Sequence, residues 1–188
     1  MTMGSTTDFR NGLIIRFEGD LHQIVEWRHH KPGKGGAMVL TKLRNLRTGA
    51  SFEQRFRPGE SVDIVRLERR KFQYLYPEGE SLCFMDQETF EQIHVDREIF
   101  GEAVRFLKEG EICEIALDGD TPVEGELPIT VELEVVDTEP GVRGDTATGG
   151  SKRATVETGA VVNVPLFIEK GDTLKIDTRS GEYLERVK

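Results

Sequence analysis

Short stretches of alternating apolar and polar residues run along most of this chain, and turn-forming residues separate them. Alternation with a period of two is typical of strands that bury one face. It predicts strands at residues 13–17, 21–27, 37–46, 51–56, 62–67, 72–76, 81–85, 111–117, 121–125, 131–136, 161–165, 173–177 and 183–187. One short helix is expected at about residues 96–107, where Asp96 can cap the first turn and one face would carry Ile99, Ala103, Phe106 and Leu107.

Turn residues among the first four strands predict two hairpins and a projecting loop. Gly19-Asp20 separates the first pair of strands, and residues 47–50 separate the second pair. Residues 30–36 lie between the two pairs and contain three glycines and one proline in seven positions. Because this composition cannot continue a hydrogen-bonded ladder, these residues are expected to project as a loop.

The strand pattern restarts near residues 65 and 127, which predicts three domains: residues 1–65, 66–127 and 128–188. Regular alternation of strands and helices is absent, which favours small antiparallel barrels over a doubly wound sheet. A chain of 188 residues with 37% hydrophobic residues suits several small cores. Periodicity by itself equally allows a two-domain division. We therefore expect an all-β protein made of three small β-barrels.

Charge is distributed unevenly along the chain. The formal net charge is −9, yet residues 1–65 carry ten Lys/Arg against seven Asp/Glu. Residues 66–127 carry seven against sixteen, and residues 128–188 carry eight against eleven. A basic first segment before two acidic ones indicates that the first faces phosphate while the acidic surface keeps the rest solvated.

The sequence lacks the motifs of catalysis, cofactor binding and membrane insertion. It contains no G-x-S-x-G, no GxxxxGK[ST] and no H-E-x-x-H. Cys83 and Cys113 stand far apart among apolar neighbours, and the four histidines add no ligand spacing, so we expect neither a metal nor a cofactor. Without a bilayer-spanning apolar run or a secretory signal at its start, the protein is expected to be cytoplasmic and to have no membrane partner.

Three aromatic residues alternate along one predicted strand: Phe72, Tyr74 and Tyr76. Such a stripe could form a platform on which bases stack. More often it belongs to a core, and we interpret it as core.

Lys34 is the strongest candidate for a functional residue. It lies between Gly33 and Gly35 at the tip of the predicted loop, where its own fold offers it no partner. An exposed lysine on a turn is usually idle, but five further cations lie on or near the adjoining strands: Arg28, Lys31, Lys42, Arg44 and Arg47. Pro32 restricts one side of the loop, and the glycines keep it slim. The combination predicts a narrow cationic finger that enters a crevice lined with phosphate.

The last third of the chain carries a pattern that resembles translation elongation factor P. Within residues 152–171, the family's residues occur at matching spacing: Lys152, Ala154, Gly159, Val162, Val164, Pro165, Ile168 and Gly171. Similar segments are residues 8–12, 85–92, 135–141, 144–146 and 177–183. The resemblance therefore runs from about residue 8 to the end of the chain.

This resemblance implies a fold and a function that the residues alone leave open. Members of the family have an SH3-like (KOW-like) first barrel followed by two OB-fold barrels, in an L-shaped, tRNA-like arrangement. They bind the 70S ribosome between the peptidyl and exit sites, contact rRNA and peptidyl-tRNA, and stimulate peptide bond formation at consecutive prolines. The protein is accordingly expected to be a translation elongation factor and not an enzyme.

The resemblance also implies roles for particular residues. The loop that would approach the acceptor stem and CCA end of the peptidyl-tRNA consists of Lys31, Pro32, Gly33, Lys34 and Gly35. Lys34 would carry a β-lysyl group on its ε-amine, attached by a lysine-modifying enzyme similar to lysyl-tRNA synthetase. Contacts to the small subunit near the exit site are implied for Gly144, Asp145, Thr146, Arg179 and Tyr183.

Two other classes of function are left open by the residues. An OB-fold nucleic-acid-binding protein acting in RNA handling or transcription would bind free oligonucleotides, which the acidic second and third segments disfavour. A small hydrolase or transferase would need a paired general acid and base, and no motif nominates such a pair among the dispersed carboxylates.

Overall fold

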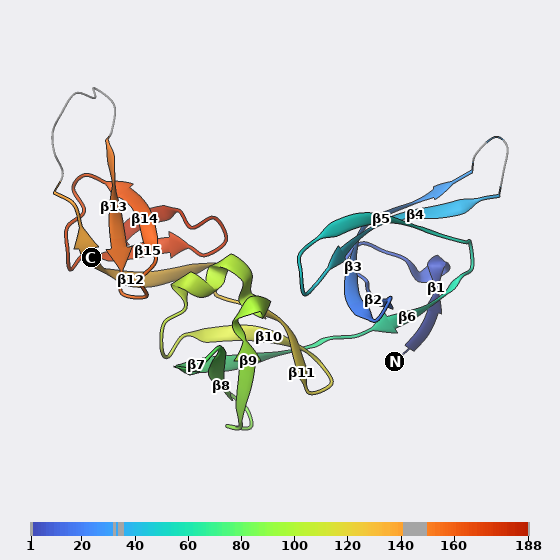
Figure 1. Cartoon of the computed structure of the whole chain (residues 1–188), viewed down its shortest axis with the longest axis horizontal. Helices are drawn as coiled ribbons and strands as arrows, with labels where there is room; N and C mark the ends of the chain where they lie inside the picture. Colours follow the sequence, from blue (N-terminus) through green and yellow to red (C-terminus); the bar gives the residue numbers. More distant parts are fainter. Residues whose placement is uncertain (1, 32, 34–35, 141–149, 188) are drawn as a thin grey trace. The chain divides into compact units, whose positions relative to one another are not determined.

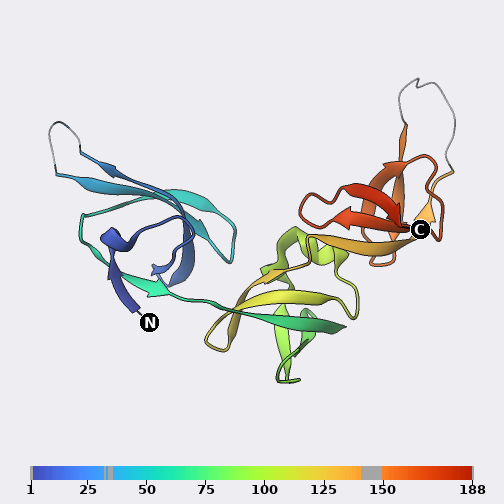
Figure 2. The ribbon, with the colours of Figure 1, turned by 180° about the vertical axis from the view of Figure 1, so that it is seen from behind.

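The computed structural model describes residues 2–31, 33, 36–140 and 150–187. These residues form three antiparallel sheets of six, five and five strands (Figure 1 and, from behind, Figure 2). The expected all-β fold with three sheet domains is confirmed. Within the described residues, no helix has the length and apolar character needed to cross a membrane.

The first sheet has the strand order β1-β6-β2-β3-β4-β5. Its strands are β1 (Thr2–Ser5), β2 (Ile14–Phe17), β3 (Asp20–His30), β4 (Met38–Asn45), β5 (Ser51–Phe56) and β6 (Ser61–Val65). The sheet encloses a core of Phe9, Leu13, Ile15, Ile24, Val39, Leu43, Phe56 and Val62. Strand β1 was not predicted, because TMGS has no alternation and forms a strand only by pairing with β6.

A two-residue turn joins β2 to β3. Phe17 pairs with Asp20, so the turn residues are Glu18 and Gly19, at φ 51° and 91°. Positive φ at both positions is typical of the type I′ turn, whose twist matches that of the flanking strands. The predicted hairpin is confirmed, but its turn lies one residue earlier than the predicted Gly19-Asp20.

The second sheet has the order β11-β10-β7-β8-β9. Its strands are β7 (Glu68–Glu78), β8 (Ser81–Asp86), β9 (Gln92–Asp96), β10 (Ile112–Asp118) and β11 (Thr121–Glu126). Phe72 and Tyr74 are buried, as the core interpretation predicts, but Tyr76 is 44% exposed. A bulge between Tyr74 and Tyr76 shifts the register against β8 and ends the alternation there.

The predicted helix is present, but it is a 3-10 helix, η2 (Arg97–Phe106), with a break at Gly101. Asp96 caps it, as predicted, by accepting a hydrogen bond from the Glu98 backbone N–H. The predicted buried face is confirmed at Phe106 and Leu107 but not at Ile99 and Ala103, because α-helical spacing does not apply to 3-10 geometry. Phe100 and Phe106 are buried, whereas Ile99 is only half-buried.

The third sheet has the order β14-β13-β12-β15-β16. Its strands are β12 (Thr130–Thr138), β13 (Ser151–Val156), β14 (Val161–Pro165), β15 (Thr173–Asp177) and β16 (Tyr183–Val187). Phe106 of η2 is fully buried within this sheet's core, beside residues such as Leu133 and Ile176. The Thr158 hydroxyl, in the turn between β13 and β14, also donates a hydrogen bond of 2.7 Å to the carbonyl oxygen of Arg105 in η2.

Compactness divides the chain into two units. Residues 1–69 with 116–124 form one unit, and residues 70–115 with 125–188 form the other. Most of the second and all of the third predicted domain thus belong to one compact unit. The boundaries 1–65, 66–127 and 128–188 stay a prediction.

One six-residue turn closes a hairpin in each sheet, at residues 45–50, 86–91 and 177–182. In each, the first side chain accepts hydrogen bonds from the backbone N–H groups two and three residues later, at 2.7–3.2 Å. The first residue's carbonyl oxygen accepts from the N–H four residues later. The first residues are Asn45, Asp86 and Asp177. This repeat, which the sequence analysis missed, is visible in the sequence as Asx-x-x-Ser/Thr.

Candidate functional site: the β3–β4 hairpin

The predicted loop joins β3 to β4, so the two strands form one hairpin. The last paired residues are His30 and Met38, and residues 31–37 connect them. Beyond Ile24, the pairings that the structure gives for β3 are with β4, and the hairpin extends past the rest of the first sheet (Figure 1). The loop therefore lies at the end of the β3–β4 hairpin, which we call the arm, and β5 pairs along β4 as far as Val39.

The residues of the predicted loop are described only in part. Lys31, Gly33 and Gly36 are exposed. Pro32, Lys34 and Gly35 lie outside the described residues, so the geometry predicted for Lys34 stays a prediction.

Two of the loop glycines have no steric reason to be glycine. A Cβ built on Gly33 or Gly36 meets no heavy atom within 4 Å among the described residues, and neither glycine has a φ in the left-handed region. Gly49, in contrast, has a φ of +72°, where a side chain is strained. The described part of the fold therefore does not require glycine at positions 33 and 36.

Basic side chains of the arm gather on its outer face. Arg28 of β3 lies opposite Leu40 of β4, which lies opposite Arg55 of β5, and directly opposed residues share a face. In the next row, Glu26, Lys42 and Glu53 are opposed in the same way. A hollow of about 220 Å³ lies over these two rows.

Arg28 and Lys42 are thus brought together as predicted, and Arg44 follows on the same face of β4, where it pairs with Ser51. Arg55 was missed, although β5 pairs with β4 without a bulge; the bulge in β3 between Ile24 and Glu26 instead decides that Arg28 shares this face. Outward alternation along residues 51–56 is the signal that could have found it.

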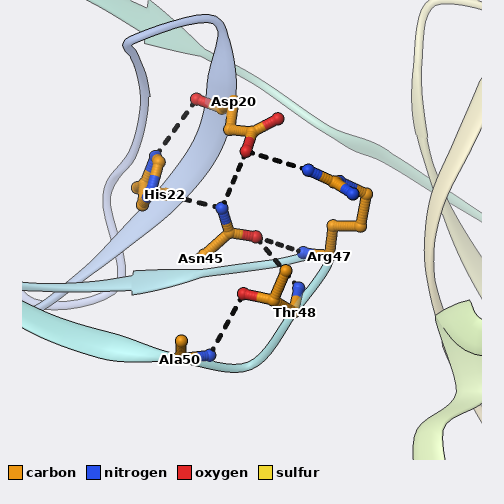
Figure 3. A network of polar contacts seen from close by, with 6 residues as sticks. All are labelled: Asp20, His22, Asn45, Arg47, Thr48 and Ala50. Atoms are coloured by element: carbon orange, nitrogen blue, oxygen red, sulfur yellow. Dashed lines mark hydrogen bonds and ion pairs between the residues drawn. The ribbon is translucent and has the colours of Figure 1, made fainter.

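Arg47 does not belong to this group, which corrects the sequence-based expectation. It lies in the turn after β4, at the end of the arm opposite the loop, where its guanidinium is 3.2 Å from the Asp20 carboxylate. Figure 3 shows the network in which it takes part. Asn45 accepts hydrogen bonds from the N–H groups of Arg47 and Thr48 and donates one of 3.0 Å to Asp20.

His22 completes this network from the core side. Its ring lies edge-on to Phe17 and Phe52, and its nitrogens face the Asp20 carbonyl oxygen and the Asn45 amide nitrogen. Hydrogen bonds from Asn45 and Arg47 lower the pKa of Asp20. The network therefore ties the start of β3 to the end of β4 and gives the arm a fixed base.

An aromatic pair lies on the opposite face of the arm. Trp27 packs partly against the first core, and the His29 ring meets it edge-on with centroids 5.2 Å apart. The arm thus has a cationic outer face and an aromatic inner face. The described residues include no group of His, Cys, Asp or Glu that could hold a metal.

The residues expected at the small subunit are partly described. Gly144, Asp145 and Thr146 lie outside the described residues. Arg179 is exposed in the 177–182 turn, and its guanidinium is 3.2 Å from Asp177. Hydrogen bonds from the Arg179 side chain and from backbone N–H groups lower the pKa of Asp177.

Tyr183, at the start of β16, is half-buried against the third core. It lines a hollow of about 510 Å³ together with Arg105, Asn163 and Ser180. Arg179 and Tyr183 thus both lie at the β15–β16 hairpin.

Three family models match successive parts of the chain. They describe an elongation factor P (EF-P) KOW-like domain at residues 5–62, an EF-P OB domain at residues 67–125 and an elongation factor P C-terminal region at residues 131–186. The chain belongs to the elongation factor P family. The first two descriptions agree with the predicted SH3-like barrel and OB-fold barrel, and membership makes the protein a translation elongation factor.

Relatives in this family are similar over the whole chain. The elongation factor P of Chloroflexus aurantiacus is 54% identical over 189 residues and is covered completely, as is this chain. That of Moorella thermoacetica is 55% identical over 185 residues, which is 98% of this chain and all of the relative.

Solved structures of a related factor share the fold. Eukaryotic translation initiation factor 5A from Methanococcus jannaschii has a TM-score of 0.51 at 21% identity and covers 68% of this chain and 94% of its own. A family protein from Naegleria fowleri gives 0.51 at 18% identity, covering 67% and 98%. At these identities the similarity shows the fold alone.

Proposed function

We propose that the protein binds the ribosome between the peptidyl and exit sites and stimulates peptide bond formation at consecutive prolines by positioning peptidyl-tRNA through Lys34. Membership of the elongation factor P family supports this proposal, and so does the cationic outer face of the β3–β4 arm. The observation that carries it is the loop: Gly33 and Gly36 meet no steric demand within the fold. A narrow crevice outside the protein would impose that demand.

The arm acts by position rather than by chemistry. Its fixed base at Asp20, Asn45 and Arg47 lets a cation at its far end be held in place without rearrangement. Aligning reactants can lower a barrier by several kcal/mol, with ~7–11 kcal/mol as the upper range for full alignment. The ribosome performs the reaction, and the factor orients the peptidyl-tRNA ester through its acceptor stem and CCA end.

Modification of Lys34 extends this reach. A ligase similar to lysyl-tRNA synthetase joins a β-lysyl group to the ε-amine as an amide, so that the side chain lengthens and keeps a terminal cation. In the last third of the chain, Arg179 and Tyr183, with Gly144, Asp145 and Thr146, contact the small subunit near the exit site. The cations of the arm and Arg179 contact phosphate, so ribosome binding weakens as the salt concentration rises.

Lys34→Ala tests this proposal directly. It removes the cation and the modification site while leaving the fold alone, so translation of a Pro-Pro-Pro reporter falls to the level without the factor. Ribosome binding and the melting temperature change little. Lys34→Arg keeps the charge but offers a guanidinium that cannot accept the same acyl group, and it fails as well.

Lys170→Ala is the matched control, because Lys170 is an exposed lysine outside the arm. It keeps full activity on the reporter. Wild-type activity in Lys34→Ala would contradict the role of Lys34.

A further inference from the structure

The three repeated turns differ at one position. The fifth residue of each has a positive φ: 72° at Gly49, 62° at Phe90 and 74° at Gly181. Glycine adopts this conformation without steric cost, whereas a bulky side chain is strained in it. Two of the turns thus show which residue the turn itself favours, and the third departs from it.

The environment of Phe90 offers no compensation for this strain. The ring is 69% exposed, and single exposed apolar side chains are ordinary. Exposure together with a left-handed backbone is not ordinary, and Glu18 and Phe90 are the non-glycine residues with positive φ among those described. Glu18 lies in a two-residue turn and is polar, so its exposure needs no partner.

The turn that carries Phe90 is firmly built. Its first residue, Asp86, is buried and accepts hydrogen bonds from the N–H groups of Glu88 and Thr89 at 2.7 and 3.1 Å. The Arg70 guanidinium lies 3.0 Å from the same carboxylate. The Phe90 N–H donates to the Asp86 carbonyl oxygen at 3.0 Å. The ring is therefore presented on a rigid tip.

We propose that Phe90 is a binding anchor that inserts into an apolar pocket, rimmed by lysine and arginine, on a protein component of the ribosome. This inference rests on the proposed function. The exposed carboxylates of Glu88 and Glu91 flank the ring, and residues 66–127 carry sixteen acidic against seven basic side chains. Such a surface repels RNA phosphate and complements a basic protein surface.

The variant Phe90→Gly tests the anchor when its binding to ribosomes that carry peptidyl-tRNA is measured. This variant gives the turn the residue found in the other two sheets, so its melting temperature stays the same or rises by about 2–4 °C. Its affinity for the ribosome falls about tenfold or more, because an anchor side chain is lost. Glu18→Gly is the matched control: it relieves the same backbone strain and leaves affinity unchanged.

Photo-crosslinking from p-benzoylphenylalanine at position 90 identifies the occupant. A protease-sensitive crosslink to a basic ribosomal protein supports the proposal, and a crosslink to rRNA or no crosslink overturns it. If Phe90→Gly binds ribosomes with wild-type affinity, the anchor proposal is overturned. The proposed function still stands in that case, provided that Lys34→Ala loses rescue of the reporter. If the wild-type chain itself fails to bind ribosomes, the proposed function fails and this inference fails with it.

Discussion

Single glycines in this chain serve two separable purposes. Gly49 has a backbone conformation that favours glycine, and the open space around it shows that the conformation alone is the reason. Gly33 and Gly36 have neither a left-handed φ nor a close neighbour among the described residues. The described residues thus give no reason for glycine at these two positions, which the proposed function places in an external crevice.

Alanine substitutions separate the two purposes. Gly36→Ala should leave the free energy of unfolding unchanged or raise it by up to about 1 kcal/mol, since the unfolded chain loses freedom. Its Pro-Pro-Pro reporter activity should fall. Gly49→Ala should lower the free energy of unfolding by about 1 kcal/mol and leave the reporter activity unchanged. Urea unfolding and the reporter assay measure both, and a Gly36→Ala variant with full activity would refute the external constraint.

At the scale of elements, the alignment of the β3–β4 arm depends on its base, the end away from the loop. The network in Figure 3 joins the start of β3, the end of β4 and the turn to β5 through one amide side chain. Asn45 is 7% exposed, so its amide is shielded from water at the point where these segments meet. The arm is thus aligned from the end that lies away from the loop.

Asn45→Ala removes two hydrogen bonds to backbone N–H groups and one to Asp20. We expect it to lower the free energy of unfolding by about 2 kcal/mol, because three part-buried hydrogen bonds are lost. Thr48→Ala, which removes one exposed bond of 3.3 Å to Ala50, should cost under about 1 kcal/mol. Equal effects in thermal unfolding would show that Asn45 is not the centre of the network.

The strands and the candidate loop could be predicted because alternation and turn residues are local properties of the sequence. Strands β1, β9 and β13 were not predicted. TMGS and SKRATV lack alternation and form strands by pairing with neighbours, whereas QIHVD does alternate and was overlooked. The buried face of η2 was predicted only in part, at Phe106 and Leu107, because its 3-10 spacing differs from the helical one. Arg47 was misjudged because the turn after β4 directs it to Asp20, and Arg55 was overlooked although its strand alternates.

At the scale of the whole molecule, each sheet contains one aspartate that supports a turn and has a lowered pKa. Hydrogen bonds from Asn45 and Arg47 lower that of Asp20, and the Arg179 side chain and backbone N–H groups lower that of Asp177. Backbone N–H groups of Glu88 and Thr89 lower that of Asp86, with Arg70 contributing. All three carboxylates therefore bind protons more weakly in the folded chain than in the unfolded chain.

This linkage predicts acid sensitivity. A group with a depressed folded pKa contributes stability above its unfolded value of about 3.9, and that stability is lost as pH falls further. The urea midpoint should thus be flat from pH 7 to about pH 5 and fall below about pH 4. Asp177→Asn keeps the turn acceptor but cannot titrate, so its midpoint should fall less steeply. A slope equal to the wild type's would contradict the linkage.

Phe106 makes the barrel boundary unsuitable as a place to cut the chain. It is the last residue of η2, which belongs in sequence to the second predicted domain, but it is completely buried in the core of the third sheet. A fragment ending at residue 126 would leave this ring in water, and one beginning at residue 127 would lack part of its interior. A chimaera that exchanges the C-terminal barrel between relatives must therefore match residue 106 to the incoming barrel.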